Sequence, residues 1–189
     1  MNYELIILAS GSPRRRELLE KAGVPFEVHA YETDEKTRAD ETAEELVQRL
    51  SLEKARAAEA HFTGRVILGA DTVVTLDGRI FGKPKDMEEA KTFLRVLSGR
   101  THDVLTGVTL IDKQGRADTW LSRTLVTFKT LTEETITTYV SMVNTLDKAG
   151  AYAIQEHGEM LVEHINGLMS NVIGLPVEEV VERLKSMEQ

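Results

Sequence analysis

The sequence predicts an α/β or α+β fold built on a mixed β-sheet. Short apolar runs typical of buried strands alternate with stripes of apolar residues at helical spacing. An Asp-Gly pair at 77–78, a strong hairpin signal, adds antiparallel pairing to the strand-helix units. The length of 189 residues fits one domain, and no repeat or linker interrupts it, so we expect a single domain over residues 1–189.

Helix-start signals separate the expected elements. Ser12-Pro13 begins a helix because proline fits the first helical position. Thr42 with Glu45, and Asp86 with Glu89, have the spacing of capping boxes. In chain order, we expect a strand at 5–9, a helix at 13–22, a strand at 26–28, a helix at 42–60, strands at 66–76 and 79–81, a helix at 86–99, strands at 104–112 and 119–129, a helix at 132–144, a strand at 160–165 and a helix from 176.

Composition and charge exclude several classes of protein. The chain has no cysteine, so a disulfide framework, a thiolate metal site and a cysteine nucleophile are all excluded. A net charge of -8 argues against a nucleic-acid binder, although a local basic cluster can still hold a small anion. Without a signal-peptide pattern or an apolar run of membrane length, the chain is expected to be cytoplasmic, with no membrane partner.

Three consecutive arginines, residues 14–16, occupy the first turn of the first expected helix. Cations at this end oppose the helix dipole, at a cost of about 0.3 to 1 kcal/mol each. An anion resting on the free N–H groups would reverse that sign. The small residues Ser10, Gly11 and Ser12 favour a phosphate-binding loop, and a solvated basic face is the alternative.

Four further positions suggest chemistry. Asp71 lies within an expected strand, and a buried carboxylate there requires a cation, a metal or a bulge, unless it serves a turn or cap. Lys54, on an apolar helix stripe, and Lys83, between glycine and proline, are candidates to bind phosphate, the alternatives being a snorkelling stem and loop solubility. The acidic residues 32–35 are candidates to bind Mg²⁺ or Mn²⁺ with Asp71, or are simply solvated. No zinc spacing appears among the histidines, and His102 is expected to be structural.

Several motifs together resemble those of the Maf proteins. The N-terminal motif reads Leu-Ala-Ser-Gly-Ser-Pro-Arg-Arg-Arg-Glu-Leu-Leu. The order and spacing of the later motifs agree over almost the whole chain. The matching segments are residues 8–19, 53–55, 69–74, 82–84, 97–102, 147–155 and 174–176.

The resemblance implies a fold similar to the inosine triphosphate pyrophosphatases, with an elongated mixed sheet, two lobes and a central cleft, commonly in a homodimer. It implies hydrolysis between the α and β phosphates of a nucleoside triphosphate with a divalent metal. The segment ending Ala-Tyr-Ala-Ile-Gln resembles the branch acting on dTTP and UTP. By position, Asp71 matches the catalytic proton acceptor. The specificity determinants match Arg14, Thr72 and Gln155, and the phosphate contacts match Ser10, Arg15, Lys54 and Lys83.

Two questions stay open at this point. The metal ligand beside Asp71 is either Asp34 or Glu35, and Asp71 itself either accepts a proton or binds the metal. The main alternative function is a nucleotide-sensing regulator of septum formation and cell division, which the family's historical association suggests. A phosphoryl-transfer enzyme is a weaker alternative because the Gly-x-x-x-x-Gly-Lys-Ser/Thr loop is absent.

Overall fold

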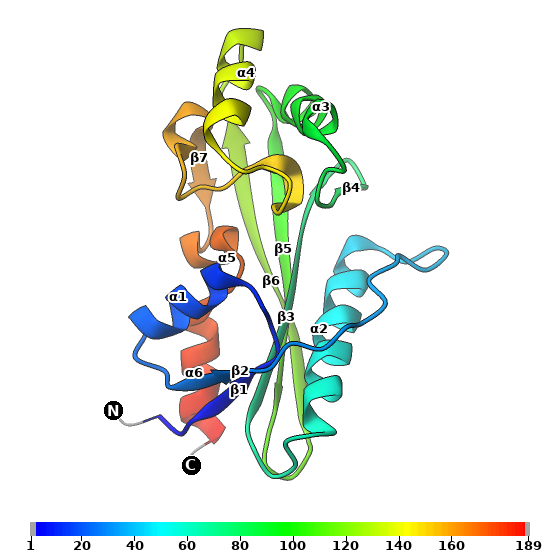
Figure 1. Cartoon of the computed structure of the whole chain (residues 1–189), viewed down its shortest axis with the longest axis vertical. Coiled ribbons are helices and arrows are strands. Elements are labelled where there is room, and N and C mark those ends of the chain that lie inside the picture. The colour runs from blue at the N-terminus through cyan, green and yellow to red at the C-terminus, as the bar shows by residue number, and fades with distance from the viewer. Residues whose placement is uncertain (1–2, 188–189) are drawn as a thin grey trace. The chain divides into compact units, whose positions relative to one another are not determined.

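The computed structural model describes residues 3–187 and confirms a mixed α/β architecture (Figure 1). Its seven-stranded sheet has the order β2-β1-β3-β5-β6-β7, and β4 pairs with β3 outside this path. The strands are β1 (Ile6–Leu8), β2 (Phe26–Val28), β3 (Ile67–Leu76), β4 (Arg79–Phe81), β5 (Thr101–Ile111), β6 (Ala117–Phe128) and β7 (Val162–Asn166). The helices are α1 (Pro13–Lys21), α2 (Ala43–Glu59), α3 (Met87–Leu97), α4 (Glu133–Met142), α5 (Met169–Ile173) and α6 (Val177–Met187), with short 3₁₀ turns η1 (Ala149–Ala151) and η2 (Gly158–Met160).

The chain forms two compact units, and three of the four boundaries fall within the long strands β3, β5 and β6, the fourth directly after α5. Among the described residues, unit 1 comprises 3–72, 106–122 and 174–187, and unit 2 comprises 73–105 and 123–173. Each unit has its own buried hydrophobic cluster, which agrees with the two expected lobes. No helix within residues 3–187 combines the length and the apolar character that crossing a bilayer requires.

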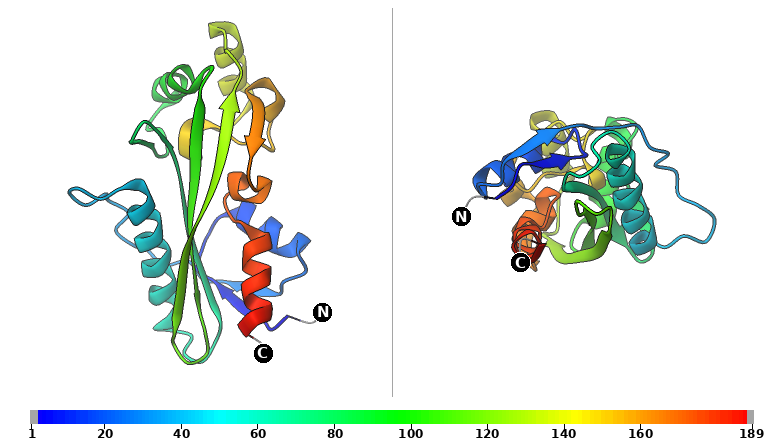
Figure 2. Two further views of the ribbon diagram at one scale, coloured as in Figure 1. Left: turned by 180° about the vertical axis from the view of Figure 1, so that it is seen from behind. Right: turned by 90° about the horizontal axis from the view of Figure 1, so that it is seen from below.

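In unit 1, β1 pairs in parallel with both β2 and β3. Helices α2 and α6 lie on opposite sides of the long strands in two views (Figures 1 and 2). Helix α2 packs unusually close to the sheet, because a Cβ atom at Gly69 would collide with the Ser51 carbonyl and one at Gly107 with the Val47 carbonyl. This close approach brings side chains of α2 against the middle of β3.

Two antiparallel pairs of strands lie in unit 2. Strand β4 pairs with β3, and β7 pairs with β6 through an irregularity at Thr127 and Phe128. Its core joins residues of α3 and α4 to the strands, with Phe81, Phe128 and Tyr139 among its fully buried side chains. Helix α3 contacts both α4 and η1.

The expected caps are present, with one correction. Thr42 and Glu45 form a complete capping box at α2. At α3, Asp86 accepts a hydrogen bond from the Glu89 amide at 2.8 Å, but the Glu89 carboxylate accepts from the Lys85 amide instead of closing the box. Helix α5, which has only five residues, was not predicted from the sequence.

Candidate active site

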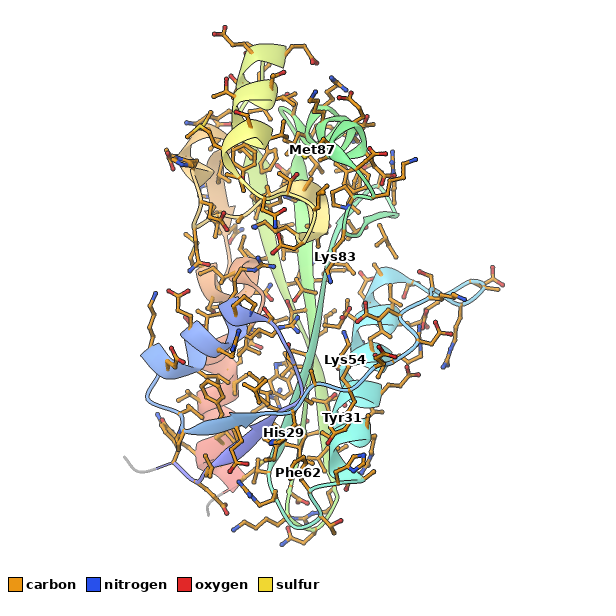
Figure 3. All side chains as sticks on the ribbon, in the orientation of Figure 1. His29, Tyr31, Lys54, Phe62, Lys83 and Met87 are labelled. Carbon is orange, nitrogen blue, oxygen red and sulfur yellow. The ribbon has the colours of Figure 1, made fainter. Side chains whose placement is uncertain are left out.

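Asp71 lies in the middle of β3 and is paired with a lysine from α2. The Nζ atom of Lys54 is 2.6 Å from Asp71 Oδ1, and both side chains are only 13% exposed. The close packing of α2 at Gly69 explains this contact, since Lys54 is adjacent to Ala55, which meets the same glycine. Figure 3 shows Lys54 on α2. Asp71 therefore has the cation that a carboxylate in a strand requires, and Lys54 is not simply a snorkelling stem.

Lys54 also binds a carboxylate from the acidic segment. Its Nζ lies 2.7 Å from Glu35 Oε1, so one ammonium group bridges Glu35 and Asp71. The neighbouring Asp34 has a different role, because its Oδ1 accepts a hydrogen bond from the Lys36 amide at 3.2 Å. Of the two expected acids, Glu35 is the one that shares a cation with Asp71.

The three arginines of α1 differ strongly in exposure. Arg16 is exposed, Arg14 is half-buried and Arg15 is buried. The Arg15 guanidinium donates to four protein oxygens, at distances of 2.8 to 3.1 Å: Gly174 O, Ser10 Oγ, Ala70 O and Thr72 Oγ1. A uniformly solvated basic face is therefore wrong. These four bonds leave one guanidinium N–H for the phosphate contact predicted for Arg15.

The hydroxyl groups near β3 are also engaged. Thr72 Oγ1 accepts from Arg15, donates to Gly174 O at 3.2 Å and lies 2.9 Å from Thr106 Oγ1. Ser10 Oγ accepts from the Ser12 amide at 3.3 Å as well as from Arg15. These contacts join the loop after β1, strand β3 and the segment at Gly174 into one hydrogen-bonded group.

The remaining candidate residues belong to unit 2. Lys83 is exposed in the turn after β4, where Gly82 O accepts a hydrogen bond from the Gly150 amide at 3.1 Å (Figure 3). Gln155 is also exposed. The segment that carries Gln155 is held at Ala153, whose carbonyl and amide both bond to the buried Tyr139 hydroxyl, and at Glu156, which pairs with the buried Lys148.

His102 is buried in unit 2, in agreement with the expected structural role. Its Nε2 lies 2.9 Å from the Tyr152 hydroxyl, and its ring meets Phe128 and Tyr152 edge-on. Burial lowers the pKa of His102 to about 4, so the ring is neutral at pH 7. Nδ1 of this ring has no hydrogen-bond partner among the described residues.

The comparisons with known proteins identify the family. The model of the family described as Maf-like protein matches residues 5–187. The chain belongs to the Maf family. Two relatives bear the name dTTP/UTP pyrophosphatase, and each is 50% identical to this Maf chain. The protein of Bacillus mycoides aligns over 97% of this chain and 95% of its own length, and that of Bacillus cytotoxicus over 96% and 95%.

A solved structure supports the fold of this Maf chain. The Ham1 protein of Staphylococcus aureus aligns with a TM-score of 0.53, covering 98% of this chain and 100% of its own, at 13% identity. At this identity the likeness shows the fold alone. It confirms the expected fold class, a mixed sheet flanked by helices.

The donor set around Asp71 fits a hard divalent cation in this Maf chain. Within residues 3–187, no three or more His, Asp or Glu side chains gather in a way that would hold a metal. Mg²⁺, however, is usually bound by one or two carboxylates and completed by waters and substrate phosphates. Glu35 and Asp71 already converge on the Lys54 ammonium, so they provide two carboxylates around one positive charge.

Several residues that hold the site were not predicted from the sequence. Thr106 and Gly174 contact Thr72 and Arg15, and Lys148 and Tyr139 support the segment of Gln155. Lys148 and Gly174 lie inside matched motifs, which was a usable signal. Thr106 and Tyr139 act through buried hydroxyls, for which the sequence offers no pattern.

Proposed function

We propose that this Maf family chain hydrolyses the pyrimidine nucleoside triphosphates dTTP and UTP to the monophosphate and pyrophosphate. The observation that supports this most is that Lys54 bridges Asp71 on β3 and Glu35 of the acidic segment. A carboxylate repels a polyphosphate, so binding alone would not need Asp71, whereas activation of water does. The names of the relatives support the choice of substrate.

The reaction joins a water oxygen to the α phosphorus. The bond from that phosphorus to the oxygen bridging to the β phosphorus breaks, and its electron pair leaves with pyrophosphate. Asp71 accepts the proton that the water loses, as a general base. The strand position suits a general base, because a residue on a regular element is held more rigidly than one on a loop.

Cationic and hydroxyl groups bind the phosphates. Arg14, Lys54 and Lys83 neutralise the charge that develops on the leaving pyrophosphate, and Ser10 adds a hydroxyl contact. Arg14 lies in the first turn of α1, whose amide groups also favour an anion. Glu35 would hold a divalent cation, Mg²⁺ or Mn²⁺, beside Asp71, and this cation would neutralise phosphate charge and polarise the α phosphate.

Recognition of the base is assigned to Gln155, with Arg14 and Thr72 as further specificity determinants. A side-chain amide offers both a donor and an acceptor, which matches the hydrogen-bonding edge of a uracil-type base. Gln155 is exposed, so its amide is accessible to a ligand.

A nucleotide panel tests the proposal. Purified protein with Mg²⁺ or Mn²⁺ is expected to convert dTTP and UTP to monophosphate and pyrophosphate faster than purine triphosphates, and chelation should abolish turnover. Separating the products by chromatography identifies the cleaved bond. Orthophosphate and a diphosphate as products would contradict the assigned bond, and tight binding without turnover would favour the regulator.

We also propose that the protein works in the cytoplasm as a homodimer, without nucleic-acid or membrane partners. The lack of cysteine fits a reducing compartment, and the acidic net charge disfavours nucleic acid. The homodimer is supported only by the family resemblance. Light scattering on the purified protein gives its mass directly, and a mass near 21 kDa, that of one chain, would exclude the dimer.

A further inference from the structure

Arg15 is committed to protein oxygens to an extent unusual for a substrate contact. Its residue surface is 8% exposed, and four of the five N–H groups of a guanidinium are used within unit 1. Two of the acceptors are Ala70 O at 2.8 Å and Thr72 Oγ1 at 3.1 Å. These residues directly precede and follow Asp71 on β3.

The geometry of a strand explains how this contact acts on Asp71. Successive side chains point to opposite faces, so the Thr72 side chain and the Asp71 carboxylate lie on different faces of β3. Arg15 binds on the Thr72 side, and Lys54 binds the carboxylate on the other. Figure 1 agrees, with α1 and α2 on opposite sides of β3. The strand around Asp71 is therefore held by one cation on each face.

The charge of Arg15 is retained in this buried place. Burial lowers the pKa of its guanidinium, while the negative charge of Asp71 acts in the opposite direction. A buried charge is tolerated where it is paired and hydrogen-bonded, and arginine stays protonated in proteins. The planar fork of arginine also reaches the Gly174 carbonyl and Ser10 Oγ together with the two groups on β3. The single ammonium group of lysine cannot bind in this geometry.

We propose that Arg15 is a positioning residue that fixes the backbone at Ala70 and the Thr72 hydroxyl, and thereby aims the Asp71 carboxylate at the water. The inference rests on the proposed hydrolysis. It gives neighbouring arginines different roles, since the half-buried Arg14 contacts phosphate and the buried Arg15 sets the geometry of the strand.

Steady-state kinetics of matched variants test this division. Arg15→Lys keeps the charge but loses the fork, so kcat should fall about 10²-fold, the scale of a small misplacement of a catalytic group, with KM changed less than about threefold. Arg14→Lys should mainly raise KM. Arg16→Lys, exposed on the same turn, is the control and should change neither constant. Rates are measured well below the unfolding temperature of each variant. A raised KM with unchanged kcat in Arg15→Lys would overturn the inference.

A measurement on the wild-type protein keeps the test decisive if Arg15→Lys fails to fold. The Nε–H of Arg15 bonds to Gly174 O at 2.8 Å, so its NMR resonance should exchange slowly with solvent. Pyrophosphate should shift the Arg14 resonance and leave that of Arg15 in place. A large shift of the Arg15 resonance would identify it as a phosphate contact. Absence of nucleotide hydrolysis by the wild type would instead refute the proposed function, and the NMR result would still stand by itself.

Discussion

The surroundings of Asp71 and the segment around Gln155 are held by different forces. Around Asp71, two cationic side chains on helices hold the site. Lys54 pairs with Asp71 and with Glu35 of the acidic segment, and Arg15 donates to four oxygens. The segment around Gln155 is irregular, with left-handed backbone at Gly150, Ala151 and His157.

Its support comes from buried aromatic side chains. Tyr139 bonds to both backbone groups of Ala153, and Tyr152 bonds to His102, while Gln155 itself is exposed. The difference indicates that the chemical groups are fixed by electrostatics, whereas the recognition residue is presented by a packed scaffold. Removing a charge near Asp71 should therefore affect turnover more than stability, and disturbing the scaffold should do the reverse.

The largest expected effect is that of Asp71→Asn. This change keeps the shape but removes the base, so turnover should fall about 10²-fold or more. Stability should change little, because Lys54 retains Glu35 as a partner. We expect the unfolding temperature to move by less than about 4 °C. Turnover and thermal unfolding measured on the same preparation check this. Near wild-type turnover in the folded variant would show that the comparison is wrong about Asp71.

The buried aromatic scaffold near Gln155 is tested by the pH dependence of the free energy of unfolding. Because the pKa of folded His102 is lowered to about 4, the unfolded chain binds an additional proton between about pH 4 and 6.5. The contribution of His102 to the free energy of unfolding should therefore be fully present above pH 6.5. It should fall as the pH drops, by about 2 kcal/mol at pH 4.5. Urea denaturation at pH 7 and 4.5 should show a smaller fall in the free energy of unfolding for His102→Gln than for the wild type. Equal falls in both proteins would show that burial of His102 does not contribute to this pH dependence.

The acidic segment offers a matched pair of variants. Glu35→Gln removes a carboxylate that shares Lys54 with Asp71, and should raise the Mg²⁺ concentration needed for half-maximal rate about 10-fold. Asp34→Asn removes the adjacent carboxylate, which bonds to a local amide, and should change that concentration less than about threefold. Metal titrations of the rate compare the two. A larger effect from Asp34→Asn would assign the metal to the other acid.

The smallest expected effect concerns base recognition. Gln155→Ala should lower the preference for UTP over GTP by about 3- to 10-fold, the value of one hydrogen bond, and leave the best rate nearly unchanged. The ratio of kcat/KM values for the two nucleotides measures it. An unchanged preference would show that the base is recognised elsewhere.

Most elements of the fold followed from local signals in the sequence. Helix α2 was predicted from its capping box and apolar stripe, and the hairpin after β3 from Asp77-Gly78. Helix α5 was missed because five residues are too few to show a helical period. Irregular backbone, such as the left-handed Ala151, depends on tertiary contacts that local propensity does not encode.

For the candidate site, the sequence predicted the residue types better than their arrangement. It indicated that Asp71 needs a cation, a metal or a bulge. It did not indicate that Lys54 would be the partner, which depends on how closely Gly69 lets α2 approach. It could not say which of the three arginines turns inward, because that depends on how α1 is rotated against the sheet. The partnership of Arg15 with Gly174 joins residues 159 positions apart, which no local pattern can reveal.

Hydrolysis of UTP in ¹⁸O-labelled water, followed by mass spectrometry of both products, shows directly which phosphorus the water attacks. If water attacks the α phosphorus beside Asp71, the label will appear in UMP and not in pyrophosphate. The rate at which labelled UMP forms will fall about 10²-fold in Asp71→Asn. Label in pyrophosphate, or formation of UDP and orthophosphate, would contradict the account.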